Sequence, residues 1–282
     1  FALFLSVAIF AASCSKDKTV IKPVENNNPI TLGLYQYGAD SGKRVFVRVT
    51  KVGTKDVNYI SVFDTGSTGM TIDAKDIVPD SVINTAGKQF SGDSIVVNGI
   101  TVTSKQSIIS YGNKTSSTKE YGYLAYAPIT ISDETGHASA KRVPIFIYYK
   151  IIDGTTGKSV GGVQGHGLDI FGVGPGTSFV NSAIASPLSY FSFGTGITSG
   201  FKLAALPGNS FSSSPTFVSK LLNIGLTSDD LTSSGFIMHT LSHSSVGGVT
   251  STIPSTITYS GQTIAANILF DSGTPYISTI EN

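Results

Sequence analysis

The stretch YISVFDTGSTGMTID, residues 59–73, decides how the rest of the sequence is interpreted. A dense apolar run, typical of a strand covered on both faces, leads to one carboxylate, Asp64, and then into a turn of glycine and hydroxyl residues. Alone, this turn could simply cap a strand, because Asp, Ser, Thr and Gly are ordinary turn residues. A catalytic interpretation needs a second carboxylate that shares a proton with Asp64.

A second motif of the same form occurs near the end of the sequence. NILFDSGTPYISTI, residues 267–280, again has apolar residues, then Phe-Asp, a hydroxyl residue, a glycine and another hydroxyl residue. Its aspartate, Asp271, follows Asp64 by 271 − 64 = 207 residues, so each aspartate could belong to its own lobe. Two carboxylates about 3 Å apart titrate as a coupled pair, because they cannot both ionise easily. The ionised member can act as general base on water, and the protonated member as general acid on a carbonyl.

The residues beside each aspartate suit such a pair. A glycine in each motif lets the two backbones approach closely. One hydroxyl group in each motif can hydrogen-bond across the junction, and another can reach an outer carboxylate oxygen. The supporting residues predicted on these grounds are Thr65, Gly66, Ser67, Ser272, Gly273 and Thr274.

The two motifs resemble the paired active-site motifs of the pepsin-like aspartic proteases, and in particular poorly characterised bacterial members of that family. The resemblance implies an all-β, bilobal fold with a few short helices. It also implies that Asp64 and Asp271 activate water to hydrolyse peptide bonds, without a metal or another cofactor. Its implied partner is a peptide or protein substrate, bound by a monomer.

Two further features of this family have counterparts in the chain. A β-hairpin flap with a Tyr-Gly near its tip is matched by Tyr111 and Gly112, although Tyr121 is an alternative because this segment is longer and more polar than usual. The hydrophobic-hydrophobic-glycine segment that completes the first lobe's catalytic loop is matched by Ile170, Phe171 and Gly172, with a stretch of helical character expected after it. Trp, which the family commonly places beside the flap, is absent from the sequence.

Composition and pattern independently favour an all-β fold. Only 13% of the 282 residues are charged and 31 are glycine, a mix that suits many short strands joined by glycine turns. Strands are predicted at 43–52, 121–131 and 141–152, the last at an edge or strand start because of Pro144. A hairpin is predicted to turn at Asn98-Gly99. Short helices are predicted at 216–226 and within 177–191, the latter broken at Pro187.

The N-terminus predicts export. Residues 1–13 form an apolar stretch too short for an ordinary membrane span, and the single cysteine, Cys14, follows it directly. This arrangement resembles a bacterial lipoprotein signal with Cys14 as the lipidated residue; a plain secretory signal with an incidental cysteine is the alternative. We therefore expect a lipoprotein of the bacterial cell envelope, attached to the membrane through this lipid anchor.

These features divide the chain into four segments. We expect a partial signal peptide at 1–14, a linker at 15–30, an N-terminal lobe at 31–190 and a C-terminal lobe at 191–282. The chain starts without Met and stops 282 − 271 = 11 residues after Asp271, so we expect a piece of a longer protein with a truncated second lobe.

Other functional classes receive less support. A net charge of +1, with no concentrated basic run, argues against nucleic-acid binding. His239 and His243 have a zinc-binding spacing, but no Glu follows the first and no third ligand lies nearby, so we interpret them as solvated. The glycine-rich stretch 160–176 lacks the Gly-Lys-Ser/Thr of a phosphate loop, and no Gly-x-Ser-x-Gly elbow is present. One alternative stays open: an envelope-anchored binding protein that keeps the cleft without hydrolysis.

Overall fold

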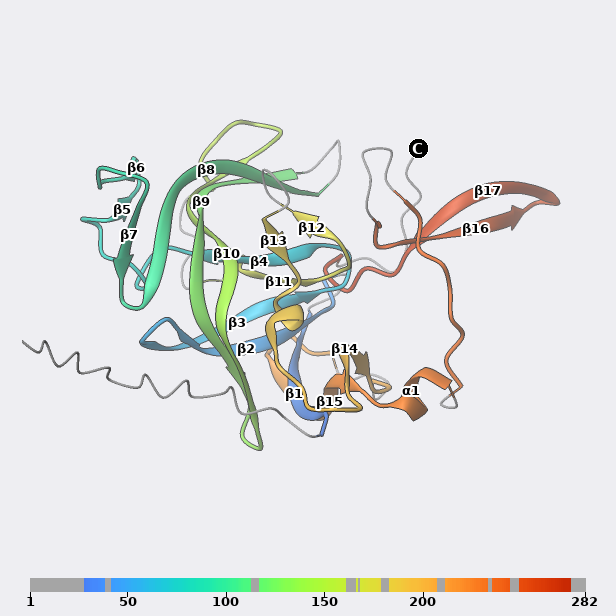
Figure 1. Ribbon diagram of the computed structural model, residues 1–282. Helices are drawn as coiled ribbons and strands as arrows, with labels where there is room; N and C mark the ends of the chain where they lie inside the picture. Colours follow the sequence, from blue (N-terminus) through green and yellow to red (C-terminus); the bar gives the residue numbers. More distant parts are fainter. Residues whose placement is uncertain are drawn as a thin grey trace, which may run out of the picture.

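The computed structural model describes residues 28–38, 42–112, 117–160, 166, 168–178, 183–206, 211–232, 235–243 and 249–274 (Figure 1). Within these residues the regular secondary structure is almost entirely β-strand, so the predicted all-β class is confirmed. The helical elements among them are a 3₁₀ turn, η2 (Pro187–Tyr190), and one short α-helix, α1 (Ser228–Thr232). The predicted signal, Cys14 and most of the predicted linker lie outside the described residues. None of the described helices has the length and apolar character needed to cross a membrane.

Most strands belong to one large mixed sheet. Its order is β14-β15-β1-β2-β3-β11-β4-β10-β9-β8-β7, and β2 also pairs with β9, so the sheet folds back on itself. The strands are β1 (Ile30–Tyr37), β2 (Arg44–Val52), β3 (Lys55–Asp64), β4 (Thr68–Asp73), β7 (Ser94–Val97), β8 (Ile100–Gly112), β9 (Ser117–Ser132), β10 (His137–Asp153), β11 (Ile170–Val173), β14 (Thr198–Leu203) and β15 (Thr216–Leu226).

The described residues also form three two-stranded sheets. They pair β5 (Ile83–Asn84) with β6 (Gly87–Lys88), β12 (Thr177–Ser178) with β13 (Ile184–Ala185), and β16 (Thr252–Tyr259) with β17 (Gln262–Leu269). Figure 1 shows the β16–β17 hairpin projecting away from the large sheet. β14 and β15 lie in the segment predicted as the second lobe, yet they extend the large sheet through β1.

Alternation along the strands creates two apolar clusters on opposite faces of the sheet. Val47 and Val49 of β2 and Met70 and Ile72 of β4 point into the main core. Along β9 and β10, every second residue points instead to the opposite face of the sheet, where a smaller apolar cluster lies. This cluster contains Leu124, Phe146, Tyr148, Ile151 and Ile184. The smaller cluster matters for the site because it lies on the same face as the pocket described below.

The predicted hairpin at Asn98-Gly99 is confirmed. These two residues connect β7 to β8, with φ angles of 49° at Asn98 and 71° at Gly99. Both angles are in the left-handed region, which Asn and Gly adopt most readily.

The helix predicted at 216–226 is wrong, because this segment is strand β15. It pairs with β1 on one side and β14 on the other, and left-handed backbone at Lys220 and Gly225 is incompatible with a helix. The apolar residues Leu221, Leu222 and Ile224 had a spacing that also fits a helix. Pairing with β1, distant in sequence, supplied backbone hydrogen bonds that no local pattern reveals.

The helix predicted within 177–191 is also largely wrong. The described part forms the short strands β12 and β13, and only the residues from Pro187 onward turn as the 3₁₀ element η2. Pro187 starts this turn rather than breaking a helix, because a first-turn proline loses no hydrogen bond there. The Ser186 hydroxyl accepts the backbone N–H of Leu188 at 3.3 Å.

The strand that contains Pro144 is not an edge strand as a whole, but Pro144 itself has a paired neighbour on one side only. Pro144 lies inside β10, which is flanked by β4 and β9. The ladder with β4 begins only at Ile145, and the register with β9 shifts between Ala140 and Val143. Pro144 therefore lies where β10 is paired with β9 alone, a position at which a strand tolerates a residue without an N–H.

Candidate functional site

The two aspartate motifs meet at one place in the structure. Asp64 is the last residue of β3, and Asp271 follows β17 by two residues. A Cβ atom built on Gly66 would lie 2.4 Å from Cγ of Asp271, and one built on Gly273 would lie 2.5 Å from Cγ of Asp64. Each glycine therefore leaves room for the carboxyl group of the other motif, as the sequence predicted.

Hydrogen bonds fasten the motifs to one another in a nearly symmetric way. The backbone N–H of Thr65 donates to Oγ of Ser272 at 3.1 Å, and the backbone N–H of Ser272 donates to Oγ1 of Thr65 at 3.0 Å. The Thr65 hydroxyl donates to the carbonyl of Phe270 at 2.6 Å, and the Ser272 hydroxyl donates to the carbonyl of Phe63 at 2.6 Å. These bonds fix the separation and tilt of the two aspartate loops, and they include the contact expected between Thr65 and Ser272.

Each carboxylate is also held by its own turn. Oδ1 of Asp64 accepts the backbone N–H groups of Gly66 at 2.8 Å and Ser67 at 3.2 Å, and Oδ2 accepts the Ser67 hydroxyl at 2.5 Å. Oδ1 of Asp271 accepts the backbone N–H groups of Gly273 at 2.7 Å and Thr274 at 3.1 Å. Ser67 therefore acts on the outer oxygen as predicted, whereas Thr274 contributes its backbone.

The environment of Asp64 favours the protonated acid. Asp64 is only 6% exposed, and burial is the main cause that raises its pKa from 3.8 to about 6. The Ser67 hydrogen bond opposes this shift, while the charge of Asp271 and a side-chain hydrogen bond with it add to it. The two carboxyl groups are thus close enough to share a proton.

The hydrophobic-glycine segment, Ile170 to Gly172, pairs with the strand that carries the first motif. In β11, Phe171 pairs with Phe63 and Gly172 pairs with Asp64 in parallel register with β3. The other side of β11 pairs with β4, so this strand lies between the two strands that enter and leave the turn. A Cβ atom on Gly172 would lie 2.6 Å from the carbonyl oxygen of Gly69, so a larger residue would push the turn away.

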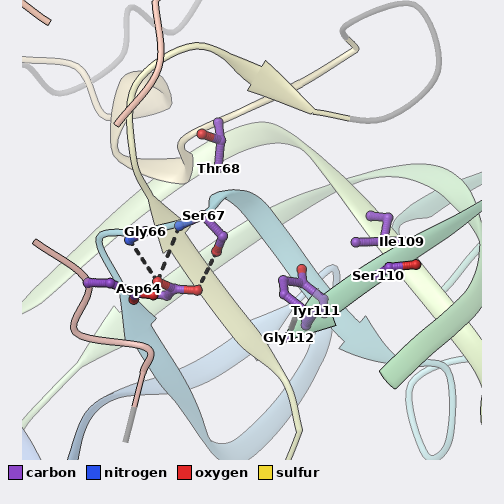
Figure 2. Close-up of a pocket in the computed structure, with 9 residues that line it drawn as sticks. Asp64, Gly66, Ser67, Thr68, Ile109, Ser110, Tyr111 and Gly112 are labelled. Carbon is purple, nitrogen blue, oxygen red and sulfur yellow. Dashed lines mark hydrogen bonds between the residues drawn. The ribbon is translucent and has the colours of Figure 1, made fainter. Parts of the chain in front are cut away.

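A pocket of about 320 Å³ lies against the aspartate pair (Figure 2). Asp64, Asp271 and the turn at residues 66–68 line one side, and residues 109–112 of β8 line the other. Figure 2 shows Tyr111 approaching from β8 toward the turn that holds Asp64. The β8–β9 hairpin thus occupies the position predicted for a flap.

Of the two candidate flap tyrosines, Tyr111 lines the pocket. Tyr121 pairs with Ile108, and its ring lies 5.3 Å from Nζ of Lys150. Because side chains alternate along a strand, Tyr121 faces away from the surface that carries Tyr111. Burial raises the pKa of the Tyr111 phenol well above its ordinary value, with the charges of Glu120 and Asp64 adding to the effect.

Two supports of the site were missed by the sequence analysis. Arg44 donates from Nε to the carbonyl of Gly273 at 2.6 Å, and so ties the second motif to β2. Behind the first motif, buried Asp169 accepts the hydroxyl of Tyr148 at 2.7 Å and the backbone N–H of Asp73 at 2.9 Å, and contacts Nδ1 of His166 at 2.8 Å. The only local signal for this network was an acid directly before the hydrophobic-glycine segment.

The histidines flagged by their spacing do not come together with the aspartates. His239 and His243 are exposed and lie outside any helix. Among the described residues there is no group of three His, Cys, Asp or Glu side chains placed to hold a metal ion.

Comparison with known proteins adds no assignment to this geometry. No protein-family model matches the chain, and a search of curated proteins returns no match.

Proposed function

We propose that the protein is a pepsin-like aspartic endopeptidase, in which Asp64 and Asp271 activate water for peptide-bond hydrolysis. The observation that carries this proposal is the mutual fit of the two motifs, with each glycine packed against the carboxyl group of the other motif. In the proposed bilobal fold, β3, β4 and β11 present Asp64 from the first lobe. The β16–β17 hairpin presents Asp271 from the second.

The shared proton supplies both catalytic roles. The ionised carboxylate removes a proton from a water molecule, whose oxygen attacks the substrate carbonyl carbon. The protonated carboxyl donates its proton to the carbonyl oxygen, which gives a neutral gem-diol. The carboxyl group that took the water proton then donates it to the amide nitrogen, while the other carboxylate removes a proton from the gem-diol. The C–N bond breaks, and the pair again holds one proton. The hydrogen bonds from residues 65–67 and 272–274 hold both carboxyl groups in place throughout.

The alternative of an inactive binding protein is less well supported. Such a protein would tolerate separated aspartates or aspartates paired with cations. Here each carboxyl group packs against the glycine of the other motif, and neither forms an ion pair within the described part of the chain.

The proposed setting is the bacterial cell envelope, with Cys14 as a lipid-modified anchor and peptides or proteins as substrates. The support for this part is the order of residues in the sequence, with the apolar stretch 1–13 directly before the single cysteine.

The test is cleavage of a peptide library by the polypeptide between about pH 3 and pH 8. Because Asp64 must retain its proton, we expect activity to be greatest at acid pH and to fall as the pH rises through about 6. Asp64→Asn and Asp271→Asn should each reduce kcat/KM by at least about 10³-fold. Equal cleavage by wild type and both variants would refute the proposal.

A further inference from the structure

The β8–β9 hairpin carries an acid beneath the pocket. Glu120 of β9 is directly opposite Ile109 of β8, and Thr118 is opposite Tyr111. Because alternate residues of a strand share a face, Glu120 and Tyr111 are diagonal neighbours on the same face of the hairpin. That face also carries Ile109, which lines the pocket with Tyr111.

The Glu120 side chain is enclosed. The residue is 2% exposed, and it lies on the face of β9 and β10 that holds the smaller apolar cluster, opposite Ile151. Within the described residues, no Lys, Arg or His forms an ion pair with it. An unpaired buried carboxylate is strongly disfavoured, so the neutral acid is the form that fits this environment.

The groups that face Glu120 come from every neighbouring element. They are Tyr111 of β8, Thr71 and Asp73 of β4, Tyr148 of β10 and Asp169 before β11. Burial raises the pKa of Glu120 well above its ordinary value, Thr71 opposes the shift, and the charges of Asp169 and Asp73 add to it.

Thr71 links the acid to the flap tyrosine. Its hydroxyl lies beside both the Glu120 carboxyl and the Tyr111 phenol. Oγ1 of Thr71 and Oε2 of Glu120 nevertheless have no hydrogen-bond partner among the described residues. A small inward movement of the hairpin would let Glu120 donate to Thr71 and Thr71 donate to Tyr111, satisfying these buried groups together.

We propose that Glu120 is a positioning residue, whose neutral carboxyl group supports Tyr111 over the Asp64–Asp271 pair through Thr71. Ionised Glu120 would add a charge near Asp73 and Asp169, and the hairpin would move outward to hydrate it. The catalytic consequence rests on the proposed function, but the effect on the hairpin does not.

The hairpin effect is tested by hydrogen exchange of backbone amides in residues 104–112 and 117–124, corrected for intrinsic rates and measured from about pH 4 to pH 8. In the wild-type protein we expect protection to fall by about tenfold across the ionisation of Glu120. Glu120→Gln, which cannot ionise, should retain protection throughout. Glu134→Gln, at an exposed acid, is the matched control and should behave as wild type.

The catalytic effect is tested with the same variants and a cleavable peptide. At acid pH, the kcat/KM of Glu120→Gln should be within about threefold of the wild-type value. As the pH rises, its KM should stay low to a higher pH than the KM of wild type. Thr71→Val should raise KM at all pH values, because it removes the link without changing the charge. A role in packing alone would not move the pH profile.

The outcomes separate the two proposals. If no peptide is cleaved but the protection step is present in wild type and absent in Glu120→Gln, the proposed function fails and the role of Glu120 in the hairpin stands. If peptides are cleaved and Glu120→Gln matches wild type in both measurements, the role of Glu120 is refuted. A wild-type protein without any protection step also refutes it, whether or not the variants fold.

Discussion

At the scale of single residues, Asp64 is held by opposing influences. Two backbone N–H groups and the Ser67 hydroxyl stabilise its charge, while burial and Asp271 oppose that charge more strongly. The proton is therefore retained to about pH 6. This retention has a cost in folding stability at neutral pH.

The first prediction concerns that cost. Because the pKa of Asp64 is raised from 3.8 to about 6, the folded state binds the proton more tightly, and stability falls as pH rises through this interval. Asp64→Asn removes the loss, since an amide can still accept from the Gly66 N–H and bond to the Ser67 hydroxyl. We expect it to be more stable than wild type by up to about 3 kcal/mol at pH 7 and similar near pH 3.5, measured by urea unfolding. An Asp64→Asn variant that is no more stable than wild type at pH 7 would contradict this, because the other carboxyl groups titrate in both proteins.

The second prediction concerns the space beside Asp271. Gly66→Ala would place a methyl group 2.4 Å from Cγ of Asp271, so the carboxyl group must move. We expect a loss of about 1–3 kcal/mol in unfolding free energy and about 10²-fold in kcat/KM. Gly136→Ala is the control, because its methyl group would meet Leu32 at an ordinary 3.5 Å. Equal effects of the two substitutions would argue against the close approach of the motifs.

The aspartates and their supporting residues were predictable because the two motifs repeat one another in sequence. Arg44 was not, since its bond to the carbonyl of Gly273 depends on β2 lying beside a segment 229 residues away. The sequence contains only a weak indication that Glu120 is buried: it is four residues before Leu124 in a strand, so both side chains are on the same face. Such a signal does not distinguish an exposed acid from a buried one.

At the scale of elements, the prediction was correct where neighbouring residues alone determine the backbone conformation. Asn98-Gly99 fixes its hairpin through backbone angles that few other residues adopt. β15 was misread because its identity is fixed by β1, whose Leu32 pairs with Leu222. Apolar residues in a short segment suit a strand or a helix, and only the partner decides.

The third prediction tests how much β15 contributes. Leu222 is fully buried in the main core, so Leu222→Ala should lower the unfolding free energy by about 2–5 kcal/mol. Ser219→Ala, at an exposed position of the same strand, should change it by less than about 0.5 kcal/mol. Chemical denaturation of the two variants checks both values, and similar results for both would show that β15 is not packed as described.

At the scale of the whole molecule, the β16–β17 hairpin carries a partly exposed apolar face. Ile257 pairs with Ile264 and Ile253 with Ile268, so these four residues share one face of the hairpin. Ile264 is 60% exposed. Contiguous exposed apolar side chains favour association.

The fourth prediction follows from this face. The resemblance implies a monomer, so we expect self-association only at high concentration, and Ile264→Lys should reduce it in sedimentation velocity, with a change in unfolding free energy within about 0.5 kcal/mol. Thr263→Lys adds the same charge on the opposite face and should leave association largely unchanged. If both substitutions act equally, net charge rather than the apolar face controls association.

The hydrogen bonds between the two motifs also have a consequence for timing. They join residues 205 to 209 positions apart, so these contacts are among the long-range contacts that form slowly during folding. Closing this long loop costs conformational entropy before the bonds can form. Asp64 also emerges from the ribosome long before Asp271 has been synthesised. On the proposed function, hydrolysis cannot begin until Asp271 has been synthesised and has come together with Asp64. The distance between the motifs along the chain would then act as a delay that protects the nascent polypeptide, and its neighbours, from cleavage.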